Sequence, residues 1–217
     1  MRGFWRVGIT AAILAAAPAA ATAQAADGAP ARDTAVVAGG CFWGVQAVFE
    51  HVRGVTQAMS GYAGGERATA EYETVSTGTT GHAESVRIVF DPAVVSYATL
   101  LKVYFAVAHD PTELNRQGPD AGTQYRSNIF YLNADQHRVA DSVITALTRA
   151  HAYPRPIVTL VTPLHGFFPA EAYHQDYALI HPDDPYIYFN DRPKVAHLKQ
   201  QFPQLWQEDP VRVLASR

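Results

Sequence analysis

The sequence predicts a single α/β (α+β) domain, a two-layer sandwich in which helices pack against a mixed sheet. Short apolar or alternating stretches, typical of strands, are interleaved with stretches whose apolar residues recur every three or four positions, typical of helices. No repeat or internal domain boundary appears, and the 217 residues are enough to bury one core.

The predicted domain begins with a strand over residues 34–38, which two glycines end. A helix follows, because apolar residues recur with helical spacing before Gly54 (Val45, Val48, Phe49 and Val52). A second strand over 55–62 leads into residues 61–81, which are rich in Gly, Thr and Ser. We expect this stretch to be a long functional loop.

The rest of the domain continues the alternation. Residues 84–90 alternate as a strand that places Glu84 on the same face as Val86, Ile88 and Phe90. We further expect helices over 97–108, 139–147 and 193–202, strands over 125–132 and 157–162, and a short helix that begins at Pro169.

The N-terminus has the pattern of a signal peptide. Arg2 and Arg6 precede an apolar, Ala-rich run over 7–21, and Ala21-Thr22-Ala23 fits the small residues of a cleavage site. We expect a signal peptide over 1–25, a linker over 26–33, the domain over 34–203 and an irregular tail over 204–217, in a periplasmic or secreted protein. An uncleaved anchor is the alternative, although the run is short for a membrane span.

Composition excludes some classes of function. The net charge is −3 and the pI about 6.3, with no run of Lys or Arg, so a nucleic-acid partner is not expected. The histidines show no metal-ligand spacing, so no metal is expected. One cysteine cannot form an internal disulfide, so Cys41 is either a buried apolar residue or a reactive one.

Cys41 lies where the first strand gives way to the first helix. Unpaired N–H groups and the partial positive charge of a helix start favour a thiolate. Phe42 and Trp43 follow at once, and apolar burial favours the thiol. The sequence leaves open which effect is larger.

Glu84 is the second residue that indicates chemistry. A carboxyl on the core face of a strand resists ionisation, so it can hold a proton at neutral pH and act as a general acid. The alternative is an acid at a strand end, partly in water. Tyr62, Tyr72 and Tyr125 lie near Gly-rich segments and could each donate a hydrogen bond into a pocket.

Five motifs in order resemble the A-type peptide methionine sulfoxide reductases and span about residues 35–181. They are Gly39-Gly40-Cys41-Phe42-Trp43-Gly44, Gly61-Tyr62-Ala63-Gly64-Gly65, Thr80-Gly81-His82-Ala83-Glu84, His109-Asp110-Pro111-Thr112 with the block 117–127, and Pro169-Ala170-Glu171-Ala172-Tyr173-His174-Gln175.

The resemblance implies a role for each matching residue. Cys41 is the nucleophile and Glu84 the acid, Phe42 and Trp43 enclose the substrate's methyl group, Tyr72 and Tyr125 assist at the sulfoxide oxygen, and Asp120 supports the site. The sequence departs from the family at three places. Thr69-Ala70-Glu71 precede Tyr72 in place of Asn-Pro-Thr, Ser76 stands where many relatives have a second cysteine, and the segment after Tyr186 lacks their cysteine-bearing tail.

The implied reaction reduces methionine S-sulfoxide, free or in oxidised proteins, through a Cys41 sulfenic acid. No bound cofactor and no stable membrane partner are expected, and the protein is expected to be a monomer. The reductant is then an external thiol: a thioredoxin-like protein, glutaredoxin with glutathione, or another dithiol.

Two other functions fit the residues. A cysteine-dependent hydrolase or acyl transferase would need His82 or His174 as a base beside Cys41. A module that only binds oxidised methionine would need no turnover.

Overall fold

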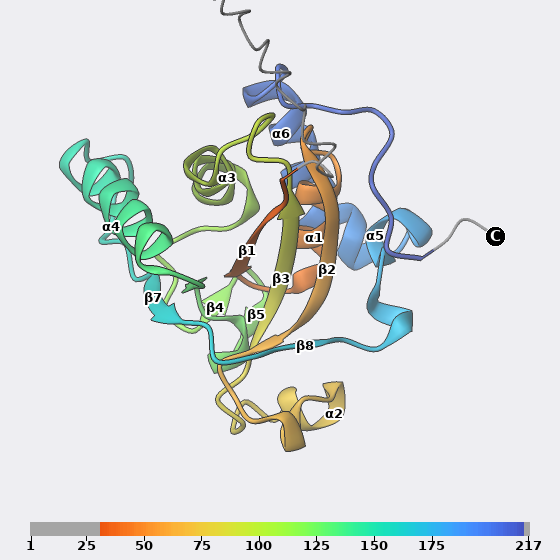
Figure 1. Cartoon of the computed structure of the whole chain (residues 1–217). Helices are drawn as coiled ribbons and strands as arrows, with labels where there is room; N and C mark the ends of the chain where they lie inside the picture. The colour runs from red at the N-terminus through yellow and green to blue at the C-terminus, as the bar shows by residue number, and fades with distance from the viewer. Residues whose placement is uncertain (1–30, 215–217) are drawn as a thin grey trace, which may run out of the picture.

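A six-stranded mixed sheet of order β7-β6-β1-β3-β2-β8 forms the centre of the computed structural model, which describes residues 31–214 (Figure 1). Only β6 and β7 pair in parallel, and every other neighbouring pair is antiparallel. The strands are β1 (Asp33–Ala38), β2 (Val55–Ala63), β3 (Ala83–Phe90), β6 (Asn128–Tyr131), β7 (Leu160–Pro163) and β8 (Phe167–Pro169). The expected signal peptide over 1–25 lies outside the described residues.

The two faces of the sheet are buried by different parts of the chain. Val37 of β1 is paired with Val86 of β3 and Ile129 of β6, and all three belong to the main core on the helical face. Residues of opposite parity, such as Val36 and Ala38, form a smaller cluster under Leu164 and Phe167. Because both faces are covered, β1 is apolar from Ala35 to Ala38 rather than alternating.

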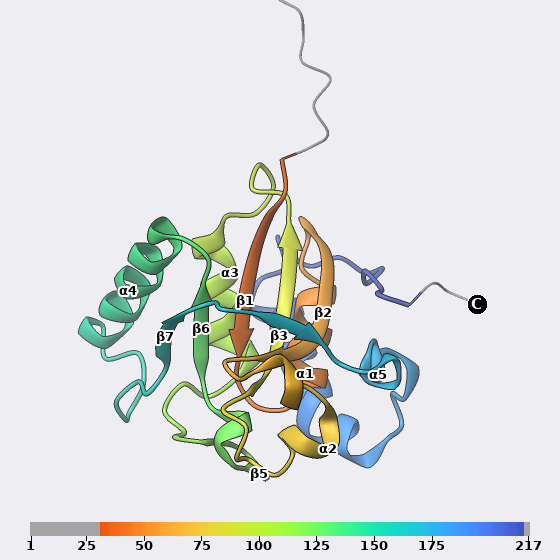
Figure 2. The same ribbon diagram turned by 60° about the horizontal axis from the view of Figure 1, so that its bottom comes forward.

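The sheet must curl, because β7 and β8 lie at its opposite edges and only residues 164–166 connect them. Six flat strands would span about 24 Å, whereas this connection reaches roughly 14 Å at most. Figure 2 shows the connection passing in front of the sheet, on the face away from α1 and α3.

Helices cover the other face. Helix α1 (Phe42–Glu50) packs on β2 and β3, and α6 (Arg192–Gln201) packs on α1. Helix α3 (Tyr97–Val103) continues as a π-helical turn, η2 (Tyr104–Ala108), and packs against α4 (Ala134–Arg149). Ser96 accepts a hydrogen bond from the Thr99 N–H at 3.1 Å and so begins α3, as the sequence predicts. The α+β class and the single domain are confirmed.

Short elements complete the chain. They are α2 (Tyr72–Val75), the hairpin of β4 (Arg116–Gln117) and β5 (Asp120–Ala121), the 3₁₀ turns η1 (Arg67–Thr69), η3 (Thr123–Tyr125) and η4 (Ala172–His174), α5 (Tyr177–Ile180) and the π-helical turn η5 (Ile187–Asp191). Among the described residues, no helix is long and apolar enough to cross a membrane.

Some predicted boundaries are wrong. Pro169 does not begin a helix but ends β8, where it pairs with Gly61. An edge strand tolerates proline, because its missing N–H is not needed by a further strand. The strand expected from 125 begins at Asn128, since residues 123–125 form η3, and the strand expected from 157 begins at Leu160. The expected loop over 61–81 contains η1 and α2.

The segment after α6 forms no further helix or strand up to Leu214, yet it packs along α1. The Leu205 carbonyl accepts from the Arg53 N–H at 2.6 Å, and the Gln207 N–H donates to the His51 carbonyl at 2.9 Å. The Val211 N–H donates to the Glu50 carbonyl at 3.0 Å. These bonds satisfy backbone groups at the C-terminal end of α1.

Candidate active site

The turn between β1 and α1 places Cys41 at the N-cap of the helix. Gly40 has φ +87°, and a Cβ there would lie 2.6 Å from the Cβ of Gln117. Glycine is therefore required by both the backbone conformation and the close approach of the β4–β5 hairpin. The absence of a side chain at Gly40 therefore lets the β4–β5 hairpin lie close to Cys41.

Burial outweighs the helix start at Cys41. The side chain is 9% exposed, and burial raises the pKa of the Cys41 thiol well above its ordinary value. The carboxyls of Glu84 and Asp191 raise this pKa further, while the Trp43 backbone N–H and the Lys194 ammonium lower it. Of the two opposing effects that the sequence indicates, burial is thus the larger, and it favours the neutral thiol of Cys41.

Glu84 lies near the start of β3, opposite Tyr62 in the register, and is 3% exposed. Its Oε2 accepts a hydrogen bond from the Phe42 backbone N–H at 3.1 Å. Burial raises the pKa of Glu84 to about 8; the Phe42 bond opposes this shift, and the nearby Asp120 charge adds to it. At pH 7 the protonated carboxyl then exceeds the carboxylate by about ten to one.

One chamber brings the predicted residues together. It has a volume of about 170 Å³ and is lined by the seven residues that the sequence analysis singles out, Cys41, Phe42, Trp43, Tyr72, Glu84, Asp120 and Tyr125, together with Tyr186. The Tyr186 hydroxyl donates a short hydrogen bond to Asp120. Tyr62 does not line the chamber. Its hydroxyl instead donates a hydrogen bond to the Glu171 carboxylate at 2.9 Å.

The indole of Trp43 is fixed on two sides. Its ring stacks on Tyr177 with the centroids 3.8 Å apart, and its Nε1–H donates to Nδ1 of His174 at 3.1 Å. His174 therefore carries its proton on Nε2, and burial lowers the pKa of this imidazole. Because its lone pair is already used, His174 cannot serve as a base for Cys41.

Tyr72 is held in place despite the altered residues before it. Its backbone N–H donates to Oε1 of Glu171 at 2.9 Å, and Ser76 Oγ–H donates to the Tyr72 carbonyl at 2.7 Å. These bonds fix the short helix α2 so that the tyrosine lines the chamber. Burial and the nearby Glu84 raise the pKa of Tyr72, so its hydroxyl stays a proton donor in a hydrogen bond.

His82, the other histidine considered as a base, is also committed elsewhere. Its Nδ1 accepts from the Gly65 N–H at 3.2 Å, so its Nε2–H donates to the Glu66 carbonyl at 3.0 Å. None of the residues that line the chamber is a histidine. The cysteine hydrolase alternative lacks its base.

Three residues near Cys41 went unpredicted: Tyr186, Asp191 and Lys194. Tyr186 precedes η5, Asp191 ends it, and Lys194 lies in α6, where the sequence predicted a helix over 193–202 but no site residue. Asp191 is fully buried and pairs with Lys194 at 3.0 Å. A Cβ on Gly44 would lie 2.0 Å from Asp191 Oδ1. The Asp191 carboxyl can therefore pack against the start of α1 only because residue 44 of the motif is a glycine.

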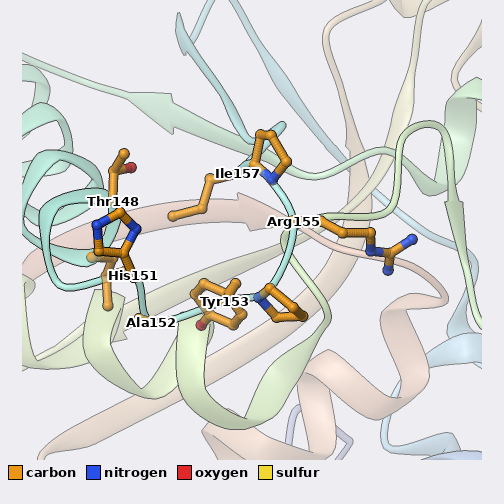
Figure 3. A pocket seen from close by; sticks show the side chains of 9 residues that line it. Thr148, His151, Ala152, Tyr153, Arg155 and Ile157 are labelled. Atoms are coloured by element: carbon orange, nitrogen blue, oxygen red, sulfur yellow. The ribbon is translucent and has the colours of Figure 1, made fainter.

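A larger hollow lies elsewhere, at the end of α4. It has a volume of about 290 Å³ and shares no lining residue with the Cys41 chamber. Figure 3 shows Thr148 and His151 on one side of it and Arg155 on the other, with the guanidinium pointing away toward its ion pair with Asp110 at 3.2 Å. The hollow contains no residue of the five motifs. Within residues 31–214, no three His, Cys, Asp or Glu side chains are grouped to hold a metal ion.

A buried thiol, a protonated carboxyl and tyrosine hydroxyls line one chamber, and these are the groups that an enzyme with a cysteine nucleophile and a proton donor requires. The family model for peptide methionine sulfoxide reductase matches residues 33–206.

Known proteins are similar over most of the chain. The peptide methionine sulfoxide reductase MsrA 2 of Mesorhizobium japonicum is 58% identical over 87% of this chain and 96% of its own. A peptide methionine sulfoxide reductase MsrA of Thermus thermophilus is 49% identical over 80% and 97%. The structure of methionine sulfoxide reductase A of Corynebacterium diphtheriae has a TM-score of 0.62 at 34% identity, covering 71% of this chain and 77% of that one.

The chain therefore belongs to the peptide methionine sulfoxide reductase family. It is an oxidoreductase that reduces methionine sulfoxide, a reaction that repairs oxidised proteins.

Proposed function

We propose that this enzyme reduces the S epimer of methionine sulfoxide, free or in oxidised proteins, with Cys41 as its only nucleophile and Glu84 as its proton donor. The observation that carries the proposal is that both residues line one small chamber and are linked through the Phe42 N–H. Methionine sulfoxide would place its methyl group between Phe42 and Trp43 and its oxygen toward Glu84.

Glu84 supplies the proton that the oxygen needs in order to leave. A sulfoxide oxygen is a poor leaving group until it is protonated, and a carboxyl with a pKa of about 8 still holds its proton at pH 7. Tyr72 and Tyr125 donate hydrogen bonds to the same oxygen. Asp120, which accepts from Tyr186, fixes the wall beside them.

Cys41 attacks the sulfur of the sulfoxide as Glu84 transfers its proton to the oxygen. Its own proton passes to the Glu84 carboxylate, so the buried chamber does not have to hold separated charges. Sulfoxide and thiol are converted to methionine and a Cys41 sulfenic acid, with oxygen transferred and no proton gained or lost overall.

The cycle then needs a thiol from outside the chain, because Cys41 is the only cysteine. A thioredoxin-like protein, glutaredoxin with glutathione, or another dithiol would supply it, and no bound cofactor is needed. We also propose that the enzyme acts as a monomer. On the basis of the basic and apolar pattern over residues 1–25, we further propose that it is exported to the periplasm or beyond.

The test is an assay with each epimer of a blocked methionine sulfoxide in the presence of dithiothreitol. Methionine should form from the S epimer alone. Turnover of the R epimer at a comparable rate, or none with either epimer, would contradict the proposal.

A further inference from the structure

Cys41 borders a second, smaller chamber as well as the substrate chamber. This second chamber has a volume of about 110 Å³, and the residues that line it include Cys41, Gln117, Asn190 and Lys194. Asp120 and Tyr186, which are hydrogen-bonded to each other, line both chambers. Cys41 is therefore bordered by two adjoining chambers with different further residues.

The two sides differ in chemistry. Aromatic rings and the protonated Glu84 line the substrate side, whereas the second chamber contains neither Phe42, Trp43 nor Glu84. Lys194 is 20% exposed, and its one hydrogen bond among the described residues goes to Asp191 at 3.0 Å. An ammonium has three N–H donors, and two of those of Lys194, which lines this chamber, have no partner among the described residues. The Asp120 carboxylate, the other charge there, already accepts from Tyr186.

Displacement at divalent sulfur takes place with the entering and leaving atoms on opposite sides of the sulfur. The sulfenic oxygen of Cys41 arises in the substrate chamber, where the sulfoxide is reduced and where Glu84 can protonate the departing water. A thiolate that displaces this oxygen must then arrive from the other side. The second chamber borders Cys41 away from Phe42, Trp43 and Glu84, and so offers a thiolate a place beside the residue outside the substrate chamber.

We propose that the second chamber is the entry site of the reducing thiol, and that Lys194 binds a carboxylate carried by that thiol. This inference rests on the proposed function, since it concerns the sulfenic acid that the function forms. The thiol R–SH displaces the sulfenic oxygen, which gives water and a Cys41–S–S–R mixed disulfide. A second R–SH then displaces Cys41, which gives R–S–S–R and the free Cys41 thiol.

The size of the chamber favours a small thiol or an extended thiol-bearing group. At about 110 Å³ the second chamber is smaller than the substrate chamber, at about 170 Å³. A mercapto acid with two or three carbons between its sulfur and its carboxylate fits such a space. The chemical class is therefore a low-molecular-weight thiol that carries a carboxylate close to its sulfur.

The experiment separates the thiol step from the sulfoxide step. Each protein is first charged with methionine sulfoxide in the absence of thiol, and the methionine and sulfenic acid formed are titrated. Mercaptopropionate, mercaptoethanol and cysteamine are then added, and the loss of sulfenic acid is timed and expressed per thiolate. The three probes carry a negative, a neutral and a positive group.

The wild type should react fastest with mercaptopropionate and slowest with cysteamine, with a preference for the acid over the neutral thiol of roughly tenfold, or about 1.4 kcal/mol. Lys194→Gln should abolish this preference, and Lys194→Arg should retain it. Lys199→Gln is the matched control, because Lys199 lies on the same helix, is paired with Glu208 and does not line the chamber. Melting temperatures report whether each variant folds.

Equal rates for the three thiols in the wild type, or a preference that survives in Lys194→Gln, would overturn the inference. The wild-type series decides the question even if Lys194→Gln does not fold. A protein that forms no methionine in the charging step would instead contradict the proposed function, so the two failures are distinguishable.

Discussion

The Phe42 N–H donates to Oε2 of Glu84 at 3.1 Å, so the residue that follows Cys41 also holds the Glu84 carboxyl. This bond joins the start of α1 to the start of β3, two segments that are 42 residues apart. It lowers the pKa of Glu84, yet burial is the larger effect and the carboxyl stays protonated near neutral pH. The geometry thus fixes the acid without ionising it.

Glu84→Gln should slow the reduction of the S epimer by about 10²- to 10⁴-fold. The amide preserves the shape and can still accept from the Phe42 N–H, but it has no proton to transfer. The measurement is methionine formed in a single turnover, with circular dichroism to confirm the fold. A rate within a few-fold of wild type would mean that another group protonates the oxygen.

The pH dependence of kcat/KM should reflect the ionisation of the Glu84 carboxyl. As the pH rises through about 8, the folded carboxyl ionises, so kcat/KM should fall by up to tenfold per pH unit. Glu84→Gln should lack this descending limb. A wild-type profile that keeps rising through pH 9 would contradict the assignment.

The free energy of unfolding should also depend on the ionisation of the Glu84 carboxyl, and the direction of the change with pH can be stated. The unfolded carboxyl ionises near pH 4.3 and the folded one near 8, so the folded state binds the extra proton between these values. The free energy of unfolding should therefore fall with rising pH across this window. Urea titrations of wild type and Glu84→Gln would show a smaller fall in the variant.

The sequence predicted the substrate chamber better than the C-terminal part of the site. Cys41 and Glu84 could be found because each lies at a recognisable place, a helix start and the inward face of a strand. Tyr186 and Asp191 could not, because they lie at the two ends of η5, a π-helical turn, and Lys194 could not, although the helix that contains it was expected. Their position depends on how α6 packs against α1, which is a tertiary contact with no local signal.

The same limit explains the misplaced helix at Pro169. Proline often begins helices, so the local pattern favoured one there. The tertiary pairing of β8 with β2 decides otherwise, since Ser60 accepts from the Ala170 N–H at 3.0 Å and Gly61 pairs with Pro169. Local propensity is a weak guide where an edge strand is available.

Gly44→Ala should destabilise the protein by about 1–3 kcal/mol, because the added methyl would lie 2.0 Å from Asp191 Oδ1. The better helix propensity of alanine, worth about 1 kcal/mol, offsets only part of this cost. Urea unfolding measures the difference. The double variant with Asp191→Ala should lose less than the sum of the two single variants, and strict additivity would show that the two sites do not touch.

Cys41→Ser should abolish turnover and leave the fold intact, because a hydroxyl is a far weaker nucleophile than a thiol near neutral pH. The side chain makes no hydrogen bond that caps α1, so the helix does not depend on it. The check is methionine formation by a variant whose melting temperature matches wild type. Appreciable reduction by the folded variant would end the assignment of Cys41.

The single-cysteine cycle is the central claim, and the mass of the protein after one round of reaction without thiol tests it most directly. With excess methionine sulfoxide, the account predicts one methionine per protein and a protein heavier by one oxygen atom, which a dimedone-type probe traps at Cys41. Added thiol should convert this species to a mixed disulfide and restart turnover. Several methionines per protein in the absence of any thiol would contradict the account.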